Sequence, residues 1–174
     1  FWRFAPQGCM ALGGFMAIQG LWAVPWLMDV NGLSRGQAAH ILFLVSVAML
    51  AGFLFVALCS GWLGRRGVSP MALLCFGMGL SLLAQIAISM DMFSPVWLWP
   101  LLGFSFSLGN ISYPQLSALF PVALSGRVNT ALNLVVFIGA FGLQWGMGVL
   151  ADVFGSSGIQ STSALRATFL VLLA

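Results

Sequence analysis

The sequence predicts an all-α fold, a polytopic bundle of transmembrane helices made of two inverted three-helix repeats. Three observations predict it: the composition, the length of the apolar runs, and a short motif that recurs half a chain apart. Of the 174 residues, 61% are hydrophobic and only 5% are charged, whereas an ordinary soluble domain has about 25% charged residues. Because so few polar residues cannot cover a soluble fold, we expect lipid to surround most of the chain.

A helix that spans a bilayer needs about 20 apolar residues, and the sequence contains five runs of that order and one shorter run. The segments between the runs are rich in Gly, Pro, Asp and Ser, which end helices for backbone reasons. The last run is too short to span, so we expect an incomplete sixth helix and a chain that is part of a longer protein. The expected spans are residues 5–28, 37–63, 69–90, 96–120, 127–151 and 164–174.

The charged residues lie near the ends of these runs, and the alternation of helices assigns them to two sides. One side holds four of the six Arg, and the other holds two Arg with all three Asp. The positive-inside rule makes the Arg-rich side cytoplasmic, so we expect a cytoplasmic N-terminus in a bacterial inner (plasma) membrane. The Arg-rich side holds Arg3, Arg65, Arg66 and Arg127, and the other side holds Arg35, Arg166, Asp29, Asp91 and Asp152.

Several classes of function are disfavoured by composition. The dispersed Arg residues do not form the clustered basic face that nucleic acids require, so no nucleic-acid partner is expected. The three Cys have no paired spacing and the only His, His40, has no second ligand beside it, so we expect neither a metal site nor a cofactor. An enzyme needs clustered His, Asp, Glu or Cys, which the sequence does not offer. No ionisable residue lies in the middle of a span, so this half supplies no proton relay.

A short motif recurs at the ends of the second and fifth runs. Both copies read Gly-x-Leu-small, followed by a charged residue and a Gly, beginning at Gly61 and at Gly148. The offset between the two copies is half the length of the chain, which divides it into three-helix units at 1–90 and 91–174. Because three is odd, the second unit enters the membrane from the opposite side. Many secondary transporters contain such inverted repeats.

At these motifs the chain resembles the major facilitator superfamily, whose signature after the second helix of each half is roughly Gly-x-Leu-Ala-Asp-Arg-x-Gly-Arg-Arg. Gly61, Leu63 and Arg66 fit this signature, with Arg65 in the place of its acidic residue. The second copy fits the spacing better. It contributes Gly148, Leu150, Ala151, Asp152 and Gly155. The stretches 19–27 and 32–34 also look like the seventh helix and the following loop of these transporters.

The resemblance covers essentially the whole chain, as helices seven to twelve of twelve. It implies transport of a small organic solute by alternating access, secondary active or facilitative, with the substrate site between two six-helix halves. It also implies a partner, the N-terminal half. It gives a gating or orienting role to Gly61, Arg65, Arg66 and Asp152. Asp152 lies at a helix C-terminus, where a negative charge is unfavourable. We therefore expect it to pair with an Arg, for which Arg166 is a candidate.

The fourth run is the most polar, and it contains Pro114. Because Pro has no N–H, the carbonyl of Asn110 is expected to lose its helical partner, which in lipid requires protein or water as a substitute. One interpretation is a broken helix that lines a substrate cavity. The other is a Pro-kinked helix whose Ser residues bond their own carbonyls. The candidate cavity residues are Asn110, Tyr113 and Gln115.

Amides in the first and fifth runs give the remaining candidates. Asn133 and Gln144 are close to three turns apart, so they share a helical face, and they either line the cavity or join helices. Gln19 is alone in the middle of the first run, where it binds substrate or packs, and Trp22 either walls a ligand or lies in the interfacial belt. Gly142 and Gly146 predict a close-packing face. The alternative function is a non-transporting membrane subunit or sensor built on the same bundle.

Overall fold

The structure, a computed structural model, describes residues 1–156, 163, 165, 166, 168 and 169. Within this part of the chain all regular secondary structure is helical, which confirms the predicted all-α class. The expected sixth span, 164–174, lies mostly outside the described residues. The helices are the N-terminal helix Ala5–Val30, α4 Arg35–Arg65, α5 Pro70–Ser89, α6 Pro95–Gly109, α7 Ser112–Ser117, the 3₁₀ turn Val122–Leu124 and α8 Ser125–Ser156.

Among the described residues, four helices are long and apolar enough to cross a membrane: the N-terminal helix, α4, α5 and the helix that contains α8. Their outward side chains are large and hydrophobic. Leu58 is 77% exposed and Trp145 is 74% exposed. Apolar surface on this scale is not stable against water, so the helices indicate an integral membrane protein.

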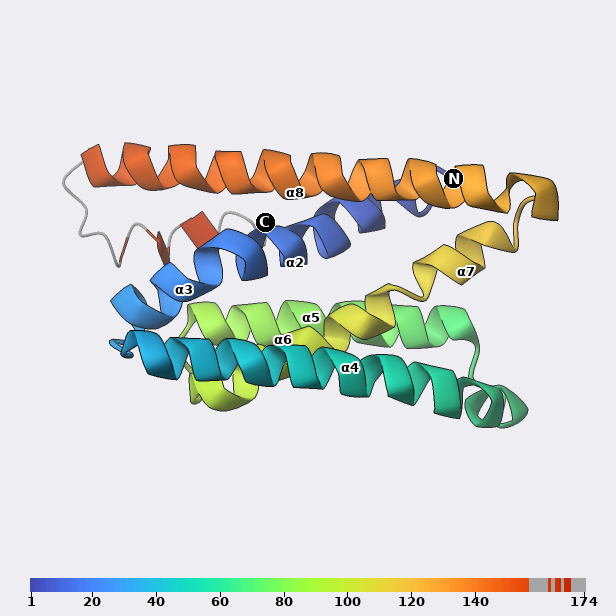
Figure 1. Ribbon diagram of the computed structural model, residues 1–174, viewed down its shortest axis with the longest axis horizontal. Helices are drawn as coiled ribbons and strands as arrows, with labels where there is room; N and C mark the ends of the chain where they lie inside the picture. Colours follow the sequence, from blue (N-terminus) through green and yellow to red (C-terminus); the bar gives the residue numbers. More distant parts are fainter. Residues whose placement is uncertain (157–162, 164, 167, 170–174) are drawn as a thin grey trace.

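Successive spans run antiparallel, with α6 and α7 following each other along the fourth span, as Figure 1 shows. The turn between α4 and α5 and the turn between α7 and α8 lie at one end of the bundle, and the α5–α6 turn lies at the other end. Arg65 is the last residue of α4, and Arg127 lies in the first turn of α8. These two residues therefore share an end of the bundle, as the sequence predicted, while the membrane side of that end stays a prediction.

The helices pack in two groups. Helix α6 packs against both α4 and α5, and the N-terminal helix packs against α8. A Cβ on Gly13 would lie 2.7 Å from the Val136 carbonyl oxygen, and one on Gly103 would lie 2.8 Å from the Val45 carbonyl oxygen. Backbones therefore touch in both groups, as small residues allow between membrane helices.

The close-packing face predicted at Gly142 and Gly146 of α8 is not formed among the described residues. In the part of the chain that the structure describes, no atom lies within 4 Å of a Cβ position at Gly142 or Gly146, whereas a Cβ on Gly139 would overlap the backbone of Cys9. Helix α8 turns Val136, Gly139 and Ala140 toward the N-terminal helix, and Gly142 and Gly146 fall outside that face. The spacing of two glycines showed that a close approach was possible but did not identify the face that makes it.

The N-terminal helix is irregular in a way the sequence did not predict. Three π-helical stretches, Gly8–Leu12, Ile18–Trp22 and Trp26–Val30, alternate with the short α-helical segments α1 Ala5–Gln7, α2 Gly13–Ala17 and α3 Ala23–Pro25. A π-helical turn holds more residues than an α-helical turn, so faces drift along this helix. Trp26 is buried, and its ring packs against Phe169 with 4.3 Å between the ring centroids.

Candidate functional site

The fourth span, expected as one helix over 96–120, is two helices that meet at Asn110 and Ile111. Helix α6 ends at Gly109 and α7 begins at Ser112. The Asn110 carbonyl accepts a hydrogen bond from the Tyr113 N–H at 3.2 Å. The expectation that this carbonyl loses its partner is therefore wrong. The Asn110 carbonyl accepts from an N–H three residues further on, as in a 3₁₀-helix. This bond takes the place of the α-helical bond that Pro114, which has no N–H, cannot donate.

Because the Tyr113 N–H now bonds Asn110, the Gly109 carbonyl is left without a backbone donor from its own helix. In a continuous α-helix the Tyr113 N–H would serve the Gly109 carbonyl. Here that carbonyl instead accepts a hydrogen bond from Nε2 of Gln7 in the N-terminal helix, at 3.3 Å. This role of Gln7 was not predicted from the sequence. A side-chain amide within a lipid-embedded helix requires a protein partner. The same reasoning that selected Gln19 would have selected Gln7, which lies in the first turns of the same helix.

Asn110 and Gln115 line one cavity of about 480 Å³, bounded by α4, the start of α5, and the two halves of the fourth span. Its other walls are mostly apolar, with hydroxyls from Ser60 and Ser107 and no charged side chain. Nδ2 of Asn110 donates to the Phe106 carbonyl at 3.0 Å, so this side chain also bonds its own helix. Both amides are only partly buried.

Tyr113 and Asn133 meet across the α7–α8 contact, where the Tyr113 hydroxyl donates to Oδ1 of Asn133. One turn further, the Ser117 hydroxyl donates to Oδ1 of Asn129 at 2.8 Å. The two pairs are four residues apart on each helix and bond α7 to α8. In this structure these side chains act as links between helices, the second of the two interpretations given for Asn133.

Gln19, Trp22 and Gln144 lie elsewhere, along the second half of the N-terminal helix and α8. Nε2 of Gln144 lies 3.4 Å from the Cβ position of Gly20, and a ring carbon of Trp22 lies 3.8 Å from that of Gly148. Gln19 is partly buried. The candidates therefore fall into three groups, and only Asn110 and Gln115 line a cavity together.

The proposed gating or orienting residues are exposed. Gly61 has no atom within 4 Å of its Cβ position, and Arg65 and Asp152 are exposed. The Arg66 guanidinium lies over the Trp62 ring, 4.6 Å from its centroid, a cation–π contact that keeps the charge at the helix end.

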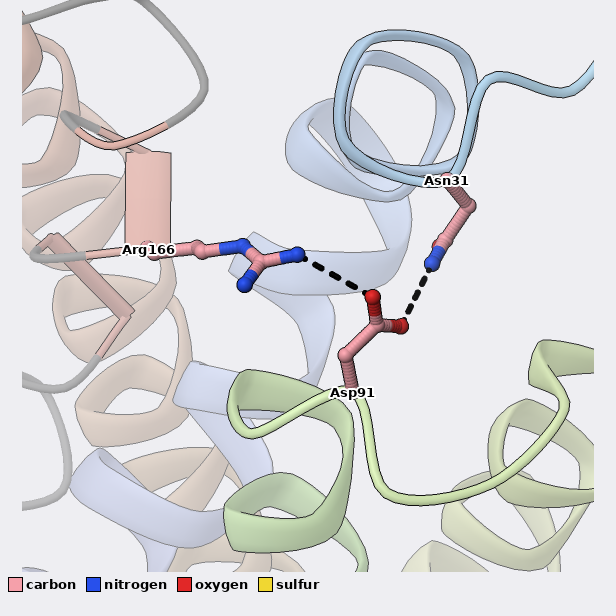
Figure 2. A network of polar contacts seen from close by, with 3 residues as sticks. All are labelled: Asn31, Asp91 and Arg166. Atoms are coloured by element: carbon pink, nitrogen blue, oxygen red, sulfur yellow. Dashed lines mark hydrogen bonds and ion pairs between the residues drawn. The ribbon is translucent and has the colours of Figure 1, made fainter.

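Arg166 pairs with Asp91 rather than with Asp152, which corrects the expected ion pair. Nη2 of Arg166 lies 3.1 Å from Oδ2 of Asp91, and Nδ2 of Asn31 donates to Oδ1 of Asp91 at 3.0 Å (Figure 2). Asp91 has a φ of 55°. This left-handed residue ends α5 and projects its carboxylate between the two partners. The contacts join the connection before α4, which holds Asn31, the connection after α5, which holds Asp91, and Arg166.

No group of three or more His, Cys, Asp or Glu that could hold a metal ion occurs among the described residues. The fold and these contacts define an integral membrane helix bundle with one broken span and a neutral cavity beside the break. No protein-family model, curated protein or solved structure matches the chain.

Proposed function

We propose that the chain is one half of a secondary active or facilitative transporter that moves a small organic solute by alternating access. The observation that carries the proposal is the break in the fourth span, where Asn110 and Gln115 line a cavity of about 480 Å³. Broken helices at membrane depth are tolerated where they are buried in protein or line a water-filled cavity, and transporters use them at binding sites.

The chemistry of this cavity favours a neutral solute. The cavity offers amides and hydroxyls, which both donate and accept hydrogen bonds, on largely apolar walls and without a charged side chain. A full charge would be costly to place there without a counter-ion. A polar uncharged or amphipathic organic molecule is the substrate class that fits.

Helix packing supports the inverted repeat on which the proposal rests. Helix α6, the first of the second proposed repeat, packs against α4 and α5 of the first. The N-terminal helix, the first of the first repeat, packs against α8 of the second. The first helix of each proposed repeat thus packs against helices of the other repeat. With the resemblance to the major facilitator superfamily, this arrangement supports an N-terminal half as partner, with the Arg-rich end cytoplasmic.

Water access at Asn110 tests the proposal without knowledge of the substrate. In a chain whose Cys9, Cys59 and Cys75 are replaced by Ser, Asn110→Cys should react in proteoliposomes with a charged, membrane-impermeant maleimide. Leu58→Cys, on the lipid-facing side of α4, is the matched control and should not react. A cysteine at position 110 that is as unreactive as the control would argue against a watery cavity.

Uptake is the second test. In cells that express the protein, Asn110→Ala and Gln115→Ala should each lower uptake of at least one labelled solute from a panel of neutral sugars, polyols and N-acetylated amino-acid amides, while the amount of protein in the membrane is unchanged. If both variants transport normally, the fourth span is not part of the site. If no solute is transported by the parent protein, the alternative of a subunit or sensor is favoured.

A further inference from the structure

The cavity beside the break follows the contact between α4 and α6, which we call the α4–α6 seam, to one end of the bundle. Its lining runs along α4 from Phe53 to Gly64 and includes Val68 in the α4–α5 turn. Gly64 is exposed beside Arg65, whereas Ser107, at the other limit of the lining, is 1% exposed. The cavity therefore opens toward the Arg-rich end of the bundle and is closed at its deep end.

A smaller cavity, of about 340 Å³, lies at the opposite end of the same seam, which we call the Asp91 end. It is lined by the first turns of α4, as far as Ile41, and by the start of α6, as far as Val96. The two cavities share no lining residue. The part of the seam between Ile41 and Phe53 thus separates a space at one end of the bundle from a space at the other.

This part of the seam is too tight to hold water. A Cβ on Gly103 would lie 2.8 Å from the Val45 carbonyl oxygen, and one on Gly52 would lie 2.7 Å from Cβ of Ser107. Where one added carbon does not fit, a water molecule or a solute does not fit either. Val45 and Gly52 are about two helical turns apart, so the closed stretch is about 10 Å long.

A hydrogen bond crosses the closed stretch. The Ser107 hydroxyl donates to the Met49 carbonyl at 2.8 Å and so joins α6 to α4. The Ser105 hydroxyl, equally buried, donates at 2.8 Å to the Leu102 carbonyl of its own helix. Ser107 therefore holds two helices together at the deep end of the cavity, and Ser105 does not.

We propose that the α4–α6 seam is a gate that closes the cavity beside the break toward the Asp91 end and is held shut by the hydrogen bond from Ser107 to Met49. While the seam is closed, solute reaches the cavity from the Arg-rich end alone. The proposal rests on the proposed function, since alternating access requires the same cavity to open to each side in turn. Small residues suit such a contact, because Gly52 and Gly103 have no side chains to repack when the helices separate.

Modification by a charged maleimide from each side of the membrane tests the gate. The reagent is added to intact cells and to inside-out vesicles that contain the chain with its native Cys residues replaced by Ser. Arg127→Cys and Met92→Cys, both at exposed positions, mark the Arg-rich end and the Asp91 end. Asn110→Cys should react rapidly from the side that modifies Arg127→Cys. From the side that modifies Met92→Cys it should react slowly, because the seam opens rarely.

Two matched pairs of substitutions then open the seam. Ser107→Ala should speed modification of Asn110→Cys from the Asp91 end about fivefold, since the loss of a hydrogen bond shifts the opening equilibrium by roughly that factor. Ser105→Ala should leave this rate unchanged. Gly52→Val should also raise it, because the new side chain has no room in the closed seam, whereas Ala51→Val, at an exposed position, should not. An unchanged rate from the Arg-rich end shows that each variant is folded.

The outcomes separate the gate from the proposed function. If Asn110→Cys reacted equally fast from both sides, the cavity would be watery but the seam would not be its barrier, which would overturn the gate alone. If it reacted from neither side, the watery cavity would be lost, and with it both proposals. Equal rates for the Ser107→Ala and Ser105→Ala variants would overturn the role of the Ser107 hydrogen bond.

Discussion

The two halves of the fourth span have similar Ser content and opposite surroundings. In α6, Ser105 and Ser107 are buried and donate to the carbonyls of Leu102 and Met49, each at 2.8 Å. In α7, Tyr113 and Ser117 are partly buried and bond amides of α8. The hydroxyls of α6 thus bond backbone carbonyls inside the bundle, whereas those of α7 bond side-chain amides of the neighbouring helix.

The largest expected effect concerns the tight α5–α6 contact. A Cβ on Gly77 would overlap the Leu108 side chain, whereas Gly79, in the same helix, has open space at its Cβ position. Gly77→Ala should destabilise the bundle by about 1–3 kcal/mol through overpacking. Gly79→Ala should be neutral or stabilise by up to about 1 kcal/mol, since Ala favours helix.

Thermal unfolding in detergent, followed by circular dichroism, measures both changes. Equal unfolding midpoints for the two variants would mean that α6 does not pack closely against α5 at Gly77. The close packing that distinguishes α6 from α7 would then be contradicted.

A smaller effect is expected at the junction between the halves. Gln7→Leu removes the donor to the Gly109 carbonyl and should cost about 1–2 kcal/mol, the penalty for a buried acceptor without a partner. Amide hydrogen exchange should accelerate in the peptide that covers 109–117. Gln85→Leu is the matched control, because the Gln85 amide donates only to Ser81, within its own helix. Faster exchange in both variants would show general loosening rather than a role at the break.

The sequence predicted features that depend on local chemistry. Four of the spans were recognised from apolar length, and several helix starts follow from single residues. Ser34 accepts from the Gln37 N–H in a capping box, and Ser69 caps α5, whose first residue is Pro70. Helix starts of this kind can be predicted from the sequence because the capping residue lies directly before the helix that it caps. The all-α class and the ends of most helices therefore came from the sequence alone.

Features set by distant contacts were not predicted. The partner of Gly109 is Gln7, 102 residues away, and the partner of Arg166 is Asp91, 75 residues away. No local pattern selects these pairs, since several amides and carboxylates were available. In the candidate site the sequence identified Asn110 and Gln115, because polarity beside Pro is a local signal, but it could not separate them from Tyr113 and Asn133. Which polar residue faces a cavity and which faces a helix depends on where α8 lies.

The link between α7 and α8 predicts a modest coupling. Tyr113→Phe and Asn133→Leu should each destabilise the bundle, and the double variant should cost less than the sum of the two, by about 0.6 kcal/mol, a typical value for a hydrogen bond between membrane helices. A double-mutant cycle on unfolding free energies in detergent measures the coupling. Strict additivity would indicate that the two side chains do not interact and would leave Tyr113 free to serve the cavity.

The smallest effect is expected at the opposite end of the bundle, at Asp91. Its N–H donates to Ile88 and the Met92 N–H donates to Ala87, at 3.2 and 3.1 Å. This is the hydrogen-bond pattern of a Schellman motif, in which the left-handed position usually holds Gly. Asp at this position carries two costs, a left-handed backbone and a negative charge at a helix C-terminus. Its contacts with Arg166 and Asn31 offset those costs.

Arg166→Gln removes the ion pair and leaves both costs in place, so it should destabilise by about 0.2–1 kcal/mol, the range for an exposed pair. Asp91→Gly removes the pair and the costs together, so its effect should be close to zero. Unfolding midpoints at low and high salt test this, since screening should abolish the Arg166→Gln effect. If Asp91→Gly were the more harmful change even at high salt, the hydrogen bond from Asn31, which salt does not screen, would be the contact that holds the connections before α4 and after α5 together.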